Sequence, residues 1–506
     1  MSNLPDWLDP LPDAQSMRAT DAWTIAEVGV ASLELMERAG EGLARIATEV
    51  APVGAIVVAC GNGNNGGDGL VVARLLREAG REVDVVFASE PVGLSVDAAA
   101  NLERLPGQAA TTLAGPLRAD AGLVIDALLG TGATGEPRGD VARAIEAIGA
   151  CNAPVLAADV PSGVDASTGA VAGVAVCATA TATFHAAKPG LWIEPGRSRA
   201  GTVHVIDIGI PPQAPGEATV GLIHDEPLLG LLPRRERGST KFMSGAVLVV
   251  GGSPGLTGAP CMAALAAGRA GAGYVTAAVP ASLSQIFETS LMEVMTLGLP
   301  DDAGALTVDA VERLPSATTH GGAIVLGPGI GRSDGALAFV RRVIGWSELS
   351  LVLDADGLSA YTGNVSALAS RGQVPLVLTP HEGELGRLLG IPSAEVAAQR
   401  LHHVREAAST AAAIVVLKGD DTLIADPEGR VAVSPGATPG LATAGTGDVL
   451  SGVLGALLAA GVEPFTAAAA GVRLHALAAI AAAARRGRDG MIASDVIEEL
   501  SLVRTR

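Results

Sequence analysis

The 506-residue chain has 49% hydrophobic and 17% charged residues, which is the composition of a compact globular protein and excludes general disorder. Its length exceeds what one hydrophobic core usually organises, so we expect two domains. Its 53 acidic and 34 basic residues give a net charge of -19, which opposes general attraction to nucleic acid or to an anionic membrane surface.

Cysteine usage and the apolar segments both indicate a soluble protein of the cytoplasm. The cysteines show no CxxC or Cys/His metal spacing and are expected to be reduced, buried thiols: Cys60, Cys151, Cys177 and Cys261. The N-terminus is acidic and Pro-rich, with no basic region leading into an apolar one, so we expect no secretory signal. The most membrane-like segment, 467–484, contains Arg473 and His475, which favours a buried helix over a membrane span.

The first half begins with helices and continues into a strand, a Gly-rich turn and a second strand. Apolar residues at helical spacing predict two or three helices over 13–50. A run rich in β-branched residues at 55–60 predicts a strand, followed by the Gly-rich segment 61–69, a helix at 70–79 and a strand at 82–88. This is the βαβ arrangement that binds phosphate, although the segment is not the usual GxGxxG fingerprint. Its Asn and Asp side chains favour a ligand that needs specific hydrogen bonds, or a monovalent cation held by amide oxygens.

Two further strands are predicted to end in polar residues. They lie at 123–126 and 155–159, and their last residues are Asp126 and Asp159. Because ligands of a doubly wound sheet bind beyond the carboxyl ends of its strands, these carboxylates and Asn65 are expected to converge on one crevice. Both Asp residues could instead be ordinary turn formers. Three successive strands that each end in a polar cluster favour the crevice.

Five motifs of the first half resemble the N-terminal epimerase half of the bifunctional NAD(P)H-hydrate repair enzymes over residues 13–210: LMERAG, CGNGNNGGDG, DALLGTG, DVPSGVD and FHAAKPG. The resemblance implies that hydrated NADH or NADPH contacts Asn64, Asn65, Gly66, Gly67, Asp68, Gly130, Thr131, Gly132, Ala133, Thr134, Gly135, Glu136 and Asp159. It implies a potassium ion held by Asn65, Asp126 and Ser162. Lys188 matches the Lys of the KPG segment; it could instead form a surface salt bridge, and its chemical role is left open.

A Pro-rich stretch after Ile210 divides the chain. We expect a first domain over 1–210, a linker over 211–234 and a second domain over 235–506. The second domain begins with a strand that runs into a Gly/Ser turn and a helix at 260–272, and further strands are predicted at 274–279, 323–326, 351–353, 376–379 and 414–417. The last four lead into the turns GPGIG, DADGL, TPHEGE and KGDDT, which favours one central sheet with a ligand along its carboxyl edge. The chain has no Walker A motif, which excludes a P-loop kinase.

The segment AGTGDVLSG at 444–452 puts three glycines and a carboxylate at the start of a helical run. Apolar spacing from Val449 onward places Gly445 to Asp448 at the helix N-terminus, where free backbone N–H groups and the positive dipole end attract an anion. Asp448 is well placed there to take a proton from a hydroxyl that attacks a phosphoryl group. For this short segment alone, a capping role of Asp448 is the favoured alternative.

The ordered motifs GGSPGLTGA, GPGIG, DADGL, TPHEGE, KGDDT and AGTGDVLSG resemble the ribokinase-like fold, and specifically the ADP-dependent NAD(P)H-hydrate dehydratase half of the same enzymes, over residues 235–505. The resemblance implies contacts with the hydrated dinucleotide from Ala259, Gly329, His381 and Asp448. It implies contacts with the adenine nucleotide from Lys418, Gly419, Asp420, Asp421, Thr422 and Gly447. Taken singly, His381 could be a satisfied buried histidine and Lys418 a surface charge at a strand end.

The whole chain is therefore expected to be an α/β protein with a Rossmann-like doubly wound domain followed by a ribokinase-like domain. The expected activities are those of an isomerase and a lyase: the first domain interconverts the R and S hydrate epimers, with Asp159 as acid or base, and the second dehydrates the S epimer. ADP is the expected co-substrate, giving AMP and phosphate, with magnesium as counter-ion and Asp448 as general base. The alternative is a small-molecule kinase with an N-terminal nucleotide-binding module. We expect a homo-oligomer without nucleic-acid or membrane partners.

Overall fold

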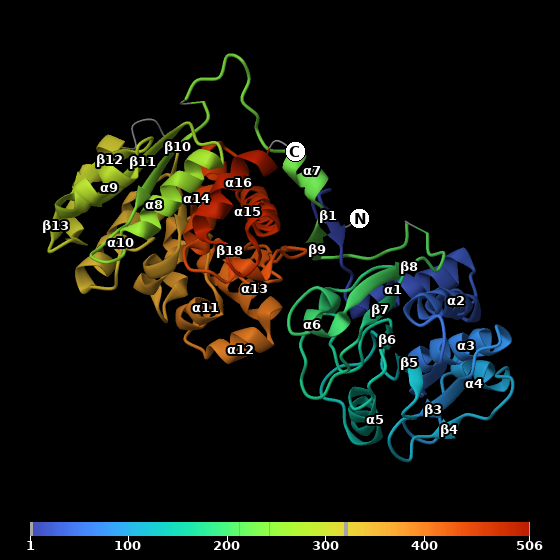
Figure 1. Cartoon of the computed structure of the whole chain (residues 1–506). Coiled ribbons are helices and arrows are strands. Elements are labelled where there is room, and N and C mark those ends of the chain that lie inside the picture. The colour runs from blue at the N-terminus through green and yellow to red at the C-terminus, as the bar shows by residue number, and fades with distance from the viewer. Residues whose placement is uncertain (1–3, 212, 242, 318–321, 505–506) are drawn as a thin grey trace. The chain divides into compact units, whose positions relative to one another are not determined.

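The computed structural model describes residues 4–211, 213–241, 243–317 and 322–504 (Figure 1). The chain divides into two compact units. Residues 10–221 form the first, and residues 222–506 form the second together with Pro5–Asp9 from the N-terminus. The segment predicted as a linker, 211–234, is not structureless, because it contains the strand β9 (Val220–Ile223) and the helix α7 (Asp225–Gly230).

A parallel sheet of seven strands forms the centre of the first unit, in the order β4-β3-β2-β5-β6-β7-β8. The strands are β2 (Ala55–Cys60), β3 (Val83–Phe87), β4 (Thr111–Thr112), β5 (Ala121–Ala127), β6 (Val155–Ala158), β7 (Ala180–Phe184) and β8 (Thr202–Ile206). The helices are α1 (Ala14–Trp23), α2 (Ser32–Val50), α3 (Asn64–Glu78), α4 (Val96–Glu103), α5 (Gly139–Gly149) and the short α6 (Arg197–Ala200). This confirms the predicted doubly wound α/β fold.

Side-chain alternation in β2 explains why helices cover both faces of this sheet. Ile56, Val58 and Cys60 lie in the same apolar cluster as residues of α2 and α3. Val57 and Ala59 point the other way and join the cluster that contains the apolar residues of α5. A strand buried on both sides reads as a continuous apolar run, which is the pattern typical of a parallel sheet.

Most of the Gly-rich segment after β2 is helical and not a turn. The helix α3 starts at Asn64, well before the predicted start at residue 70. Its glycines permit close packing: a Cβ added at Gly66 would lie 1.9 Å from the carbonyl oxygen of Gly61. The glycines therefore let the first turn of α3 lie directly over the end of β2.

The second unit is built on an eleven-stranded sheet in the order β1-β9-β20-β19-β18-β17-β16-β15-β10-β11-β12, in which β1 is Leu8–Pro10. Seven neighbouring strands are parallel: β10 (Ala246–Val250), β11 (Tyr274–Pro280), β12 (Met295–Leu299), β15 (Ala323–Leu326), β16 (Ser350–Leu353), β17 (Leu376–Leu378) and β18 (Ile414–Leu417). Antiparallel strands that the sequence reading did not predict extend one edge: β19 (Leu423–Ala425) and β20 (Val431–Val433). The second unit is therefore an α/β domain with one central, mainly parallel sheet, as predicted.

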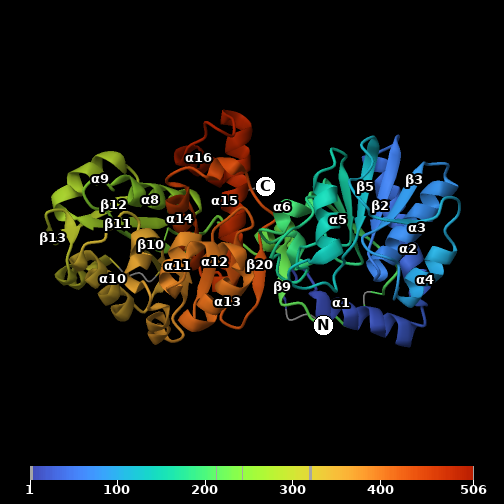
Figure 2. The same cartoon turned by 90° about the horizontal axis from the view of Figure 1, so that it is seen from below.

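The main helices of the second unit are α8 (Gly258–Arg269), α10 (Asp334–Trp346), α11 (Glu382–Leu389), α13 (Arg400–Ala411), α14 (Thr446–Ala459), α15 (Pro464–Arg486) and α16 (Ala493–Val503). Shorter elements are α9 (Ser284–Ser290), α12 (Ser393–Ala398), β13 (Asp301–Asp302) and β14 (Ala305–Leu306). Figure 2 shows α14, α15 and α16, in red, beside one another. A Cβ added at Gly452 of α14 would lie 2.1 Å from the carbonyl oxygen of Ala263, so a glycine is what lets α14 approach α8 closely.

The predicted membrane-like segment lies in α15. This helix is long and apolar enough to cross a membrane, but 72% of its most apolar window is buried inside the structure. Its Arg473 is satisfied internally by an ion pair of 2.6 Å with Asp225 and a hydrogen bond of 2.8 Å to the carbonyl oxygen of Gly436. The helix is therefore a core helix of the second unit, as expected.

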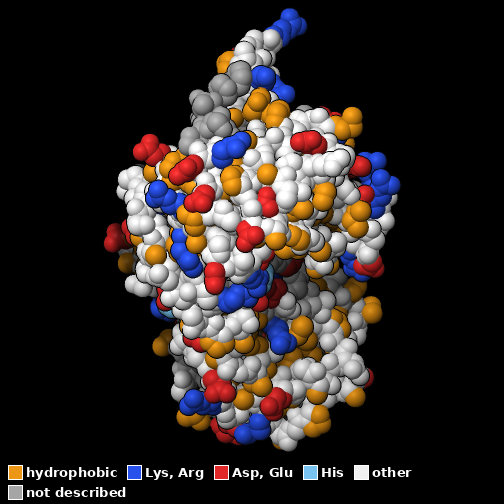
Figure 3. All heavy atoms as spheres, turned by 90° about the vertical axis from the view of Figure 1, so that its left-hand side faces the viewer, with side chains coloured by type: hydrophobic (Ala, Val, Ile, Leu, Met, Phe, Trp, Pro, Cys, Tyr) orange, Lys and Arg blue, Asp and Glu red, His pale blue; other side chains and the backbone are white. Residues whose placement is uncertain are grey.

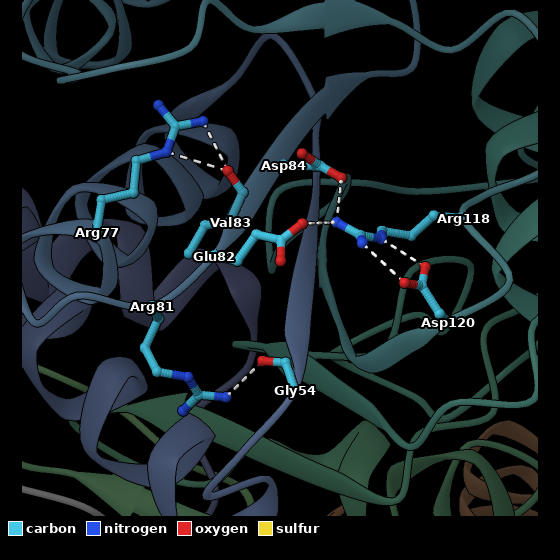
Figure 4. A network of polar contacts seen from close by, with 8 residues as sticks. All are labelled: Gly54, Arg77, Arg81, Glu82, Val83, Asp84, Arg118 and Asp120. Carbon is cyan, nitrogen blue, oxygen red and sulfur yellow. Dashed lines mark hydrogen bonds and ion pairs between the residues drawn. The ribbon is translucent and has the colours of Figure 1, made fainter.

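The protein surface carries both acidic and basic side chains, some of them in ion pairs. At the edge of the first unit, Arg118 pairs with Glu82, Asp84 and Asp120 at 2.6 to 3.0 Å and ties the loop before β5 to β3 (Figure 4). Acidic and basic side chains are mixed over the face shown in Figure 3.

The thiols differ from the prediction: Cys60 is buried, but Cys177 is exposed. All four cysteines are free.

The N-terminal segment stabilises the second unit and not the first. Trp7 is 3% exposed, and its ring centroid lies 5.6 Å from that of Phe465 on α15. The backbone N–H of His224 donates to the carbonyl oxygen of Trp7 at 2.9 Å, which fixes the segment beside β9.

Removing this indole should therefore destabilise only the second unit. A buried Trp→Ala change costs about 3–5 kcal/mol, which corresponds to a shift of about 2–4 °C per kcal/mol in a domain of this size. Calorimetry of Trp7→Ala should show a lower melting temperature for the second unit alone. The matched variant Trp23→Ala, in α1, should lower only the transition of the first unit. A fall of both transitions in Trp7→Ala would contradict the assignment.

Candidate active sites

A cavity of about 780 Å³ opens at the carboxyl edge of the first sheet. The site residues predicted from the sequence that line it are Asn64, Asn65, Asp68, Gly130, Thr131, Gly132, Ala133 and Asp159. Gly66 and Gly67 are buried in α3, where a Cβ at Gly67 would lie 2.6 Å from Met36. Thr134, Gly135 and Glu136 are described but are not in the cavity lining. The structure thus brings together three of the segments that the motifs had singled out.

Lys188 and Asp159 form a buried ion pair in the lining of this cavity. The Nζ of Lys188 lies 2.6 Å from Oδ1 of Asp159, and it also donates to Oγ1 of Thr183 at 2.8 Å. Lys188 is 1% exposed, so the alternative of a surface salt bridge is wrong. Burial acts to raise the pKa of Asp159, but the charge of Lys188 and the hydrogen bonds from Lys188 and Thr131 hold it below its usual value. Asp159 is therefore an anion at neutral pH.

Asp68 faces the same cavity in the opposite electrostatic situation. It is 9% exposed and has no hydrogen bond or ion pair with the described residues. Burial raises its pKa well above the usual value, and the neighbouring charges of Asp159 and Asp21 raise it further, against the opposing effect of Lys188. The pKa of Asp21 is raised as well, mainly by burial. One lysine thus serves several carboxylates, and Asp68 is left without a cation.

The residues expected to hold potassium lie around one loop. Ser162 donates to Asp126 through Oγ at 2.6 Å and through its backbone N–H at 2.8 Å, and Leu129 donates to Oγ of Ser162 at 2.9 Å. A Cβ added at the next residue, Gly130, would lie 3.3 Å from Oδ1 of Asn65. Both amide atoms of Asn65 are buried without a hydrogen-bond partner among the described residues. Burial raises the pKa of Asp126 to about 6. An orphaned amide oxygen near a buried carboxylate without a cationic partner fits a monovalent cation.

In the second unit, an ion pair links the residues that directly follow β16 and β18. Lys418 follows β18, and its Nζ donates to Oδ1 of Asp354, directly after β16, at 3.1 Å. Oε2 of Glu384 lies 3.6 Å from the same Nζ. Ser451 of α14 donates to the other oxygen of Asp354 at 2.5 Å. Lys418 is therefore an ion-paired residue of the sheet edge, which contradicts the alternative of a free surface charge.

The start of α14 presents a carboxylate and free backbone donors beside Lys418. Gly445 is the N-cap, in the left-handed region with φ of 91°, and it gives no side-chain cap. A Cβ added at Gly447 would lie 3.6 Å from Nζ of Lys418. Asp448 makes no hydrogen bond or ion pair with the described residues, which contradicts the capping alternative. Burial and the charge of Asp354 raise the pKa of Asp448 to about 7, although Lys418 opposes this.

The predicted contacts for the dinucleotide lie at different points of the same edge. Gly329 has φ of +62°, and a Cβ added there would lie 3.3 Å from Cβ of Ala259, so these two residues are neighbours. His381 is not a buried histidine. Its side chain is 55% exposed, and its Nδ1 accepts the backbone N–H of Gly383 at 3.0 Å as the N-cap of α11. His381 is thus a capping residue whose Nε2 faces Glu384 at 3.6 Å.

The predicted nucleotide turn, 418–422, is held in shape by its own side chains. Thr422 donates through Oγ1 to the carbonyl oxygen of Gly419 at 2.6 Å. Asp421 is 1% exposed and forms an ion pair of 2.8 Å with Arg400, so this carboxylate is committed to the fold. Asp420 and Gly419 are exposed on the turn.

Three functional-looking side chains were not assigned from the sequence. Asp354 and Glu384 belong to turns that the motifs singled out, but nothing in the sequence shows that both face Lys418. His475 of α15 is buried beside Thr446, and burial lowers its pKa to about 4, so the ring is neutral at pH 7. The signal that was available was the position of Asp354 as the first residue after a predicted strand.

Comparison with known proteins places both halves of the chain. A family profile described as "NAD(P)H-hydrate dehydratase" matches residues 247–502, and one described as "YjeF-related protein N-terminus" matches residues 32–190. A solved structure, the ADP/ATP-dependent NAD(P)H-hydrate dehydratase from Bacillus subtilis, is 27% identical with a TM-score of 0.48 and covers 56% of this chain and 96% of that one.

Two relatives are similar over nearly their whole length. The bifunctional NAD(P)H-hydrate repair enzyme of Salinibacter ruber is 42% identical, covering 98% of this chain and 96% of that protein. The enzyme of the same name from Moorella thermoacetica is 40% identical, covering 97% of this chain and 96% of that protein. Identity at this level over both units shows that the chain belongs to the family of bifunctional NAD(P)H-hydrate repair enzymes.

Proposed function

We propose that this chain repairs hydrated NADH and NADPH in two steps, one in each unit. The first unit interconverts the R and S epimers, and the second dehydrates the S epimer to NAD(P)H at the expense of ADP, giving AMP and phosphate. The observation that carries the proposal is Asp448, an unpaired carboxyl group with a pKa of about 7 at the N-terminus of α14. The cavity of the first unit, with its Lys188–Asp159 pair, supports the epimerase step.

In the dehydration, Asp448 takes the proton of the substrate hydroxyl as its oxygen attacks the terminal phosphorus of ADP. A new P–O bond forms, and the bond to the AMP oxygen breaks. Backbone N–H groups from Gly445 to Gly447 stabilise the transferring group, and Lys418 stabilises the nucleotide phosphates. Phosphate then leaves the ring carbon with its electron pair, driven by the lone pair of the ring nitrogen, and loss of a proton from the neighbouring carbon restores the dihydropyridine. A pKa near 7 suits a base that acts at neutral pH.

Magnesium would reach this site with the nucleotide. The carboxylates of Asp354 and Glu384 already face Lys418, which leaves Asp448 as the unpaired one among these described carboxylates. Magnesium usually keeps several waters and is bound through one or two carboxylates together with phosphate oxygens. When bound, it would neutralise charge on the phosphates.

In the epimerase site, Asp159 acts as the acid or base at the hydroxyl-bearing carbon, and Lys188 keeps it ionised. Potassium would be held by Asn65, Asp126 and Ser162, where it supplies the positive charge that the buried Asp126 lacks. We also propose a cytoplasmic location, supported by four free cysteines, and a homo-oligomer, which the size of the enzyme in solution would test.

The competing small-molecule kinase is disfavoured by the relatives, which are repair enzymes over both units. The two reactions also differ in product. A kinase releases a stable phosphorylated alcohol, whereas the repair enzyme releases free phosphate and a reduced nicotinamide that absorbs in the near ultraviolet.

The role of Asp448 can be separated from helix capping by Asp448→Asn. An amide cannot accept the proton, so turnover of the S hydrate should fall by roughly 10²- to 10⁴-fold while the fold and the epimerase step are kept. Absorbance of the reduced nicotinamide measures the rate.

Asp495 provides a matched control, because it is an acidic residue at the same position of another helix. Its carboxylate accepts the backbone N–H of Ile492 at 2.9 Å and is a true cap of α16. Asp495→Asn should keep nearly the wild-type rate. If Asp448→Asn keeps more than about a tenth of the rate, Asp448 is not the base.

The pH profile of the dehydration follows from the same carboxyl group. A general base must be deprotonated, so kcat/KM should rise with pH and level off above about 7, the pKa of Asp448. Stopped assays of phosphate release between pH 5 and 9 would give the profile in several buffers. A rate that is flat across this range would contradict the assignment.

Potassium should increase the stability of the first unit and the rate of epimerisation. A ligand that binds only the folded state raises its melting temperature with concentration. The first-unit transition should therefore shift upward in potassium relative to a bulky organic cation, and Asp126→Ala should remove the shift. Equal melting temperatures and equal epimerisation rates in the two salts would argue against a cation site here.

A further inference from the structure

More carboxyl groups than basic side chains line the cavity of the first unit. The carboxyl groups therefore differ in their protonation states. The charged groups that line it come from each element packed around it: Arg18 and Asp21 on α1, Asp68 on α3, Asp97 on α4, Asp159 after β6 and Lys188 after β7. Lys188 is taken by Asp159 at 2.6 Å, with further hydrogen bonds to Thr183 and to the carbonyl oxygen of Phe184. The positive charge of Lys188 is thus already paired with Asp159.

Asp68 lies just after the first turn of the glycine-rich helix α3, and that first turn contains the predicted substrate contacts Asn64 and Asn65. It is more than nine-tenths buried, lines the cavity and has no hydrogen bond or ion pair with the described residues. A buried carboxyl group without a partner is costly as an anion and stable as a neutral acid. Asp159, fixed by Lys188 and Thr131, is the reverse case.

We propose that Asp68 is the general acid of the epimerase step and that Asp159 is its partner base. This rests on the proposed epimerisation of hydrated NADH and NADPH. Enzymes place an acid and a base in one site by giving two carboxyl groups surroundings that shift their pKa values in opposite directions. Asp21, which is half-buried on α1, is the competing candidate for the acid.

Epimerisation proceeds through loss and re-addition of water at the hydroxyl-bearing carbon. Asp68 gives its proton to the hydroxyl of the hydrate, and the C–O bond breaks with its electron pair on the oxygen, which leaves as water. The lone pair of the ring nitrogen forms a C=N bond to the same carbon. A water molecule adds to the opposite face, the C=N electrons return to nitrogen, and Asp159 takes the surplus proton. Exchange of protons with water in the open cavity restores the resting state.

Removing the acid is the direct test, in the full-length chain with the spontaneous epimerisation rate subtracted. Asp68→Asn should lose roughly 10²- to 10⁴-fold in enzymatic epimerisation, and Asp68→Glu should recover part of it. Dehydration of the S epimer should be unchanged in both. Glu78→Gln, the same change of charge at the exposed end of α3, should epimerise at the wild-type rate.

Two readouts separate an acid from a binding or packing residue. The wild-type epimerisation rate should fall as pH rises through the pKa of Asp68, and Asp68→Asn should lack this limb. Epimerisation in ¹⁸O-water should place ¹⁸O in the hydroxyl of the product in step with the change of epimer. A raised pKa also means that the folded state loses stability as pH rises through it, so Asp68→Asn should melt at or above the wild-type temperature at pH 8.

Several outcomes would overturn the inference. They are an Asp68→Asn variant that keeps more than about a tenth of the rate, a variant that raises only KM with the same pH profile, or epimerisation without ¹⁸O uptake. A loss of activity that follows a fall in melting temperature would assign Asp68 a structural role, and a greater loss in Asp21→Asn would move the acid to α1. If the wild-type chain does not exceed the spontaneous rate, the proposed epimerase function itself fails.

Discussion

Both units depend on one arrangement: a largely buried lysine at the carboxyl edge of a parallel sheet is ion-paired, and a nearby carboxyl group is left unpaired. In the first unit Lys188 pairs with Asp159, and Asp68 is left over. In the second, Lys418 pairs with Asp354, and Asp448 is left over. Breaking such a buried pair is costly because the remaining charge has no partner. The lysine therefore keeps its paired carboxylate ionised, whereas the unpaired carboxyl group has a raised pKa.

The parallel sheets explain why these groups meet. Strands of one direction bring all their carboxyl ends to one edge, and the residues that follow them lie side by side although they are far apart in the chain. Asp354 and Lys418 are separated by 64 residues, yet Nζ and Oδ1 are 3.1 Å apart. Glycines let the helices pack closely: Gly66 lets the start of α3 lie against the end of β2, and Gly452 lets α14 approach α8, in backbone contacts that a Cβ would block.

This arrangement places a cost on stability at the sites themselves. A carboxyl group that is buried without a partner disfavours its charged form, so each unpaired Asp weakens the fold where it is ionised. The core offsets this cost: β2 is apolar on both faces, and α14 and α15 are buried along most of their length. The N-terminal strand β1 lies at the edge of the sheet of the second unit, and Trp7, just before it, packs on Phe465. Reactivity and rigidity are thus supplied by different parts of the same unit.

The sequence by itself determined the fold class, every parallel strand that it named and the segments that follow them, because apolar runs and glycine-rich turns are local signals. It also singled out Asp448 and Asp159 as candidate site residues and identified the family. Only the tertiary structure decided that the glycines of 66–69 lie inside a helix, that His381 is an exposed cap and that Pro5–Asp9 joins the second unit. It alone showed that Lys188 is buried against Asp159 while Asp68 has no partner. Pairing and burial depend on residues distant in the chain, and no local pattern records which carboxylate a lysine will reach.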